Sequence, residues 1–223
     1  MTKVILALPG RTFSGTFLMN WSRTLMELTK NGYDFMVTNE YSSFVTFSRM
    51  KTLGLDVLRG ADQKPFGGQV DYDIWLTIDS DIVFTPKQVI ELLEDTKKYP
   101  VVSGLYQMQD MKHYACVKDW DLDHFKKMGS FQFMKVGELE KEGKYVPVAY
   151  NGMGFFACRR EVLDKMKYPY FTYPLIEMEG EDGKLIRDTC SEDVAFCKNL
   201  KDVGFEVIVN TTLRVGHEKT LVI

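Results

Sequence analysis

The sequence has 223 residues, 45% of them hydrophobic and 26% charged, which suits one globular domain with a sizeable core. Lys and Arg total 28 against 31 Asp and Glu, so no strong field favours nucleic acid or an anionic membrane surface. This balance of charge argues against nucleic acid as a partner and favours a small molecule.

Up to residue 105, apolar runs alternate with amphipathic segments. The apolar runs predict strands at residues 3–8, 34–38, 73–78 and 101–105. Apolar side chains at three- and four-residue spacing predict helices between them, at residues 15–30, 44–58 and 87–97. Thr85 and Pro86 suit the N-cap and the first position of the last helix. Such alternation predicts a mostly parallel sheet.

Beyond residue 105 the pattern changes. Residues 107–150 form short, aromatic-rich, irregular pieces, which we expect to face a substrate. Regular structure is predicted again in four segments: a strand at 155–158, helices at 160–166 and 191–203, and a closing strand at 205–209. The predicted fold class is α/β, a single α/β/α sandwich with a mostly parallel central sheet.

The N-terminal apolar run stops at Pro9-Gly10 and is too short for a transmembrane helix. It also lacks the small-residue cleavage site of a signal peptide, so we expect a cytoplasmic protein without a membrane span. The cysteines show no CxxC spacing and do not suggest a disulfide framework, which favours reduced thiols at Cys116, Cys158, Cys190 and Cys197.

The segment Asp79-Ser80-Asp81 directly follows an apolar strand. Side chains two apart on an extended backbone project to the same side, so the two carboxylates are expected to converge on one point. Hard oxygen ligands suit Mg²⁺ or Mn²⁺, and open α/β sheets bind ligands outside the carboxyl ends of their strands. Alternatively, these residues only form a capped turn before the helix that begins at Pro86.

Three more motifs accompany this one: Gly152-Met153-Gly154-Phe155, a helix start at Ser191-Glu192-Asp193, and Gly216-His217 near the end. Together the four motifs resemble those of GT-A glycosyltransferases, in particular the inverting, family-two-like enzymes. The resemblance runs from the first strand to His217 and is loose over residues 107–150. In size and in its short Leu-Pro-Gly-Arg loop, the chain is also similar to the small glycosyltransferase domain of a chlorella virus.

The resemblance implies a GT-A domain over residues 1–223, with a nucleotide-sugar-binding half (1–105) and an acceptor-binding, catalytic half (106–223). The implied activity is metal-dependent transfer of a sugar from a nucleoside-diphosphate sugar, UDP-linked, to a hydroxyl of a carbohydrate acceptor, with inversion. A nucleotidyltransferase is a rival reading, although Pro9-Gly10-Arg11-Thr12 departs from the Gly-rich loop of those enzymes. A catalytically silent nucleotide- or carbohydrate-binding module is another.

The resemblance also implies a donor-binding set, made up of Pro9, Gly10, Arg11, Arg49, Asp79, Ser80, Gly152, Gly154 and Lys219. In this set Arg11 is suited to a phosphate or a base edge, and Arg49 could pair with Asp79 or a phosphate. Both arginines could equally be ordinary surface residues. The two glycines would let backbone approach a sugar closely, or would serve a bulge or turn.

The family's general base corresponds to Asp193, with Glu192 as the second candidate, and its metal ligands to Asp79, Asp81 and His217. The expected cofactor is a divalent cation, Mn²⁺ or Mg²⁺. Acidic residues in a first helical turn also stabilise the helix dipole, so capping alone could explain Glu192 and Asp193. A lone histidine can likewise be an ordinary core or surface residue.

Two features are left open. The polar segment at residues 177–187 is either a mobile lid or the tip of a hairpin, and a flexible loop is favoured. Four aromatic residues of the irregular region could stack on sugar faces or fill a core: Tyr106, Tyr114, Trp120 and Phe131.

Overall fold

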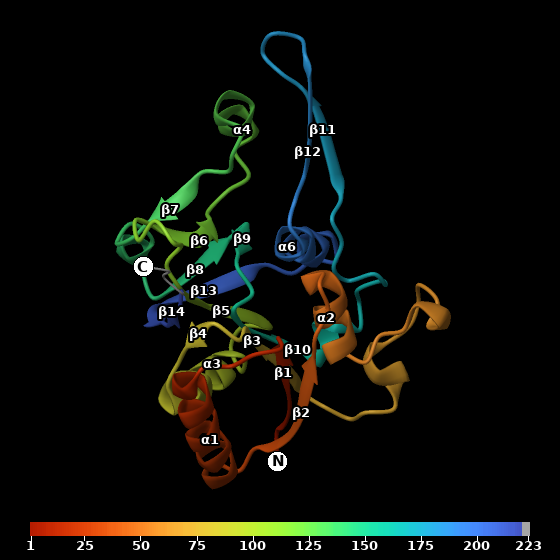
Figure 1. Ribbon diagram of the computed structural model, residues 1–223, viewed down its shortest axis with the longest axis vertical. Helices are drawn as coiled ribbons and strands as arrows, with labels where there is room; N and C mark the ends of the chain where they lie inside the picture. Colours follow the sequence, from red (N-terminus) through yellow and green to blue (C-terminus); the bar gives the residue numbers. More distant parts are fainter. Residues whose placement is uncertain (220–223) are drawn as a thin grey trace.

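The computed structural model describes residues 1–219 and is built around a seven-stranded sheet (Figure 1). The strand order is β2-β1-β3-β10-β5-β13-β8. Strands β2, β1, β3, β5 and β13 run parallel, and β10 and the edge strand β8 run the opposite way. The strands span Lys3–Pro9 (β1), Asp34–Glu40 (β2), Ile74–Ile78 (β3), Val101–Leu105 (β5), Tyr145–Val148 (β8), Phe155–Arg159 (β10) and Val207–Arg214 (β13).

Helices cover both faces of the sheet, as the alternation of side chains along β1 requires. Ile5 and Ala7 point into a core with helices α2, α5 and α6, whereas Val4, Leu6 and Leu8 point into a second core with α1 and α3. The helices span Gly15–Lys30 (α1), Val45–Thr52 (α2), Pro86–Asp95 (α3), Arg160–Leu163 (α5) and Glu192–Asp202 (α6). The predicted class, an α/β sandwich with a mostly parallel central sheet, is confirmed.

Smaller elements lie beyond one end of the sheet. They comprise β6 (His113–Val117), β7 (Phe133–Lys135), β9 (Tyr150–Asn151), helix α4 (Leu122–Met128) and the hairpin of β11 (Leu175–Glu179) and β12 (Leu185–Thr189). Single 3₁₀ turns occupy Val57–Arg59, Pro65–Gly68 and Leu139–Glu142. In Figure 1 helix α4 and the hairpin extend from the body at the same end. Strand β14 (Gly216–His217) pairs with β4 (Ile82–Val83) beside the main sheet.

Several segments differ from the prediction: the helix predicted at residues 160–166 ends at Leu163, and the closing strand predicted at 205–209 spans Val207–Arg214. The helix expected at residues 44–58 ends at Thr52, because Gly54 adopts a left-handed φ of 57° and turns the chain.

Residues 177–187 are the tip of a hairpin and not the flexible loop that was favoured: residues 177–179 pair with residues 185–187, and residues 180–184 form the turn. The sequence left the direction of the strand at residues 155–158 open; β10 is antiparallel because the chain returns at the carboxyl end of β3, where the Asp79 amide donates to the carbonyl of Gly154 at 2.9 Å.

The structure also bears on the expectations about a membrane span and about disulfide bonds. Among residues 1–219, no helix is long and apolar enough to cross a membrane. The four cysteines are buried and free.

Candidate active site

The acidic motif lies at the carboxyl end of β3, where the chain turns. The amide of Ile82 donates to the carbonyl of Asp79 at 3.1 Å, so residues 79–81 form a tight turn and not extended backbone. The strand geometry from which convergence of Asp79 and Asp81 was expected is therefore absent, but both residues line the same hollow, and their convergence on one point stays a prediction. Each carboxylate has partners of its own.

Asp79 is paired with Arg49 of helix α2. The guanidinium donates from Nη1 and Nη2 to the two carboxylate oxygens, at 2.9 and 3.0 Å. Its Nε also donates to Glu192 Oε1 at 3.2 Å. The Arg49 side chain is only 3% exposed, against 26% for Asp79 and 11% for Glu192. A single buried cation thus links the acidic turn to the start of α6.

The electrostatics of this triad follow from its burial. Burial raises the pKa of both Asp79 and Glu192, and the charge of Arg49 opposes that rise. Bidentate arginine–carboxylate bonds are among the stronger hydrogen bonds in proteins. In this structure, Asp79 therefore occupies two of the donors that Arg49 would otherwise offer to a phosphate.

Asp81 faces the C-terminal segment. Its Oδ2 lies 3.1 Å from His217 Nε2 and 2.7 Å from Lys219 Nζ. Pairing of β14 with β4 holds this contact, with Gly216 opposite Val83. A Cβ at Gly216 would lie 3.0 Å from the Cβ of Val83, so the glycine permits the close approach of the two short strands.

The histidine is oriented by a second hydrogen bond. His217 Nδ1 lies 2.8 Å from the carbonyl oxygen of Gln107, which can only accept, so Nδ1 carries a proton and Nε2 faces Asp81. Partial burial favours the protonated carboxyl of Asp81, but hydrogen bonds from His217 and Lys219 outweigh it and lower the pKa of Asp81 to about 2. The hydrogen bond with Asp81 raises the pKa of His217.

The predicted metal ligands are only partly brought together. Over the described residues 1–219, no group of three or more His, Cys, Asp or Glu side chains could hold a cation, and Asp79 faces Arg49. Asp81 and His217 do lie together, and their hydrogen bond uses a proton on Nε2; if His217 were neutral with its proton on Nδ1, as the Gln107 contact favours, a cation could take that proton's place at Nε2. Divalent cations often take one or two protein ligands and complete their shell with substrate phosphates. The pair fits such a site.

A hollow of about 450 Å³ opens beside the acidic turn. Its walls include Pro9, Gly10, Arg11, Tyr41, Ser80 and Asp81, from the ends of β1, β2 and β3. Gly10 has a φ of 155°, and a Cβ there would lie 2.8 Å from Ser80 Cβ, so only glycine lets the two loops meet. The Arg11 guanidinium lies over the Tyr41 ring at 5.7 Å. The structure thus gathers the predicted Pro9–Arg11 loop with the acidic turn.

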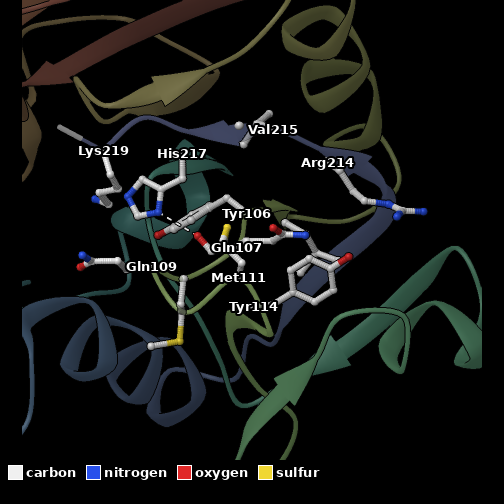
Figure 2. A pocket seen from close by; sticks show the side chains of 12 residues that line it. Tyr106, Gln107, Gln109, Met111, Tyr114, Arg214, Val215, His217 and Lys219 are labelled. Atoms are coloured by element: carbon white, nitrogen blue, oxygen red, sulfur yellow. Dashed lines mark hydrogen bonds between the residues drawn. The ribbon is translucent and has the colours of Figure 1, made fainter. Parts of the chain in front are cut away.

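A second hollow, of about 410 Å³, is lined in part by His217 (Figure 2). Lys219 lies at one end of it, and Arg214 and Tyr114 at the other. Tyr106 packs edge-on against the His217 ring, with centroids 5.0 Å apart. Asp81 borders the first hollow and His217 the second, so the hydrogen-bonded pair stands between them.

Asp193 lies in the first turn of α6. Its Oδ2 accepts from Tyr150 Oη at 3.0 Å, and its Oδ1 accepts from the amide of Val194 at 2.9 Å and from the hydroxyl of Ser191. Ser191 occupies the N-cap position but makes no side-chain bond to the helix backbone. Burial, and next the charge of Asp193, raise the pKa of Tyr150 well above 10, so Tyr150 stays protonated and donates. The turn thus holds an oriented carboxylate.

The predicted glycines have a packing reason of their own. A Cβ at Gly152 would collide with the phenol of Tyr106, and one at Gly154 would lie 2.9 Å from Ile82 Cδ1. The Gly154 amide also donates to the Tyr106 hydroxyl, at 3.3 Å. Both glycines are buried. Their close contacts are with protein side chains, and approach to a sugar stays a prediction.

Sequence reasoning missed two residues of the site. Gln107 orients His217 through a backbone carbonyl, so no side-chain pattern could reveal its part. Tyr150 reaches Asp193 across 43 positions of sequence. The four aromatic candidates divide: Tyr106 packs on His217 and Tyr114 is buried, whereas Trp120 and Phe131 line a third hollow, near α6.

Comparisons with known proteins bear on the fold. No family model matches the sequence, and no curated protein matches it. The crystal structure of A197 from STIV matches over 99% of this chain and 87% of its own, with 21% identity and a TM-score of 0.56. The structure of glucosyl-3-phosphoglycerate synthase from Mycobacterium tuberculosis, in complex with Mn²⁺, UDP and phosphoglyceric acid, matches over 99% and 72%, with 12% identity and a TM-score of 0.48.

The similarity to A197 shows a shared α/β fold. The TM-score of the second match is too low to support any further conclusion. The observed fold is the expected α/β class with a mostly parallel central sheet, and its assignment to the GT-A type is a proposal. The narrower resemblance to the chlorella-virus domain stays a prediction.

Proposed function

We propose that this protein is a metal-dependent glycosyltransferase of the GT-A type, which transfers a sugar from a nucleoside-diphosphate sugar to an acceptor hydroxyl. We further propose a UDP-linked donor, a carbohydrate-bearing acceptor and inversion at the anomeric carbon. Residues 1–105 would bind the donor, and residues 106–223 would bind the acceptor and supply the base. All of these details rest on the motif resemblance together with the geometry below.

One observation carries the proposal: three motifs far apart in sequence are joined by direct hydrogen bonds. Arg49 connects Asp79 to Glu192, which neighbours Asp193, and Asp81 of the same acidic turn bonds to His217. A capped turn before α3 would need none of these contacts. Buried charges are costly unless paired, so a chain without use for this cluster gains little from keeping it.

On the donor side, the hollow beside the acidic turn would hold the nucleotide. Tyr41 offers a ring face at the hollow's wall, and Arg11 lies over it as a cation. The backbone of Gly10 packs closely against Ser80, and because Gly10 has no side chain, this wall of the hollow stays open. Lys219, at 2.7 Å from Asp81, is within reach of a diphosphate that approaches Asp81.

Asp81 and His217 would hold the divalent cation, Mn²⁺ or Mg²⁺, which when bound would neutralise charge on the leaving diphosphate. The carbonyl of Gln107 keeps Nδ1 of His217 protonated, so that Nε2 is the nitrogen available for coordination. Asp79 would stay with Arg49 and shape the turn.

Asp193 would act as the base that takes the proton from the acceptor hydroxyl as it attacks. Its two oxygens are oriented by Tyr150 and by the amide of Val194. A carboxylate in this role typically contributes about 10²–10⁴-fold to the rate. Glu192 is less suited to the role, because it is buried and bonded to Arg49.

A thermal-shift series tests the proposal. UDP at about 100 times its dissociation constant should raise the melting temperature by about 5–10 °C when Mn²⁺ is present, and by clearly less without it. Release of UDP from a panel of UDP-sugars would then identify the donor. A protein that no nucleoside diphosphate stabilises, with or without Mn²⁺, would contradict the proposal.

A further inference from the structure

A third hollow, of about 260 Å³, lies between helix α4 and the β11–β12 hairpin, the two elements that extend from the body in Figure 1. We call it the apolar hollow. One wall is formed by α4 and its flanking residues, and the other by strand β11 of the hairpin. The apolar side chains of these walls are Trp120, Leu122, Phe125, Phe131, Ile176 and Met178. Of the described lining residues, only Lys198 carries a charge.

The floor of the apolar hollow is helix α6, through Val194 and Lys198. Val194 directly follows Asp193, and its amide donates to that carboxylate at 2.9 Å. On the α4 side, the Trp120 ring lies 6.4 Å from the ring of Tyr150, whose hydroxyl donates to Asp193 at 3.0 Å. Asp193 does not itself line the hollow, but two of the lining residues, Val194 and Trp120, connect the hollow to it.

The chemistry of the walls limits what can fill the hollow. A sugar alone carries hydroxyl groups that need polar partners, and burial of a hydroxyl without one is costly. Aromatic and aliphatic walls favour an apolar occupant. A volume of about 260 Å³ is slightly smaller than that of pockets that enclose a whole drug-sized ligand. The hollow therefore suits one compact group of a larger molecule.

The two elements that form the walls of the hollow also contact each other. Lys127 of α4 lies 3.5 Å from Glu181 at the hairpin tip, so an ion pair links the two walls. A second copy of the chain would need a face of roughly 800 Å² for stable association. A hollow of about 260 Å³ between two slender elements offers no such face, which favours a small molecule over a protein partner.

We propose that the apolar hollow binds a compact apolar group of the acceptor, such as an aromatic ring, carried next to the hydroxyl that Asp193 activates. The inference rests on the proposed function and adds to it the class of acceptor: a glycoside or alcohol with an apolar substituent, not a bare sugar. Met178 and Ile176 on the hairpin and Trp120 beside α4 would then determine specificity.

The test compares two probes that differ only in the apolar group, phenyl β-D-glucoside and methyl β-D-glucoside. Titration calorimetry with UDP and Mn²⁺ present should give about tenfold or tighter binding for the phenyl compound. Met178→Asp should abolish that preference and leave UDP binding unchanged. The matched control is Leu185→Asp on the same hairpin, because Leu185 is 61% exposed and does not line the hollow.

The outcomes separate the two proposals. If UDP binds with Mn²⁺ but the two glucosides bind equally, or if Met178→Asp keeps the preference, the acceptor inference is overturned and the transferase proposal stands. If UDP does not bind at all, the proposed function fails, and the inference fails with it. A dimer in sedimentation velocity that Met178→Asp dissociates would also overturn the inference, because a second copy would then fill the hollow.

Discussion

At the scale of single residues, Arg49 has the clearest structural role. It is almost fully buried and holds two carboxylates, one from the acidic turn and one from α6. Arg49→Met should destabilise the protein by about 3 kcal/mol, because it leaves both carboxylates without their cation. Urea unfolding should show this loss, whereas Lys51→Met, at an exposed position of the same helix, should be nearly neutral. Equal stability of the two variants would refute the bridging role.

The sequence predicted individual residues well where a local signal existed. The acidic turn follows a buried strand. Asp79 was one of the two partners predicted for Arg49, the other being a phosphate, and the two side chains are paired in the structure. It could not place Tyr150 on Asp193 or Gln107 on His217, since these contacts depend on the path of the irregular region. Long-range contacts of this kind have no periodic pattern in the chain.

At the scale of elements, the two-residue strand β14 positions His217. Gly216→Val should push β14 away from β4, since even a Cβ would lie 3.0 Å from Val83 Cβ. We expect loss of the Mn²⁺-dependent part of the UDP thermal shift, with a stability loss of only about 1–2 kcal/mol. Gly15→Val is the matched control, because nothing lies within 4 Å of a Cβ there. An unchanged Mn²⁺ response in Gly216→Val would remove His217 from the cation site.

Elements with their own start signals were predicted closely. Helix α3 begins at Pro86 with the capping box of Thr85 and Gln88, and α1 spans the expected residues. The errors lie where tertiary structure decides. The direction of β10, which the sequence left open, depends on where the chain re-enters the sheet, and the β11–β12 hairpin was one of two alternatives of which the flexible loop was favoured.

At the scale of the whole molecule, the sheet explains why the sequence could predict that the loops after β1 and β3 lie close together. Carboxyl ends of parallel strands meet at one edge of a sheet, so the ends of β1 and β3 were bound to be neighbours. The hydrogen-bonded turn at residues 79–81 and the burial of Arg49 were not deducible from that rule. As a result, the two acids of the motif differ in role: Asp79 is a structural partner of Arg49, and Asp81 is the candidate metal ligand.

This division predicts a split between two carboxylate variants. Asp81→Asn should abolish Mn²⁺-dependent UDP binding in calorimetry, because Asp81 lies at the nucleotide hollow beside His217. Asp193→Asn should leave UDP binding intact and slow transfer by about 10²–10⁴-fold, because Asp193 would act only on the acceptor. Asp123→Asn, an exposed residue of α4, is the control for charge removal. Equal loss of UDP affinity in both variants would mean that Asp193 supports the donor half through the Arg49 cluster, and that the base lies elsewhere.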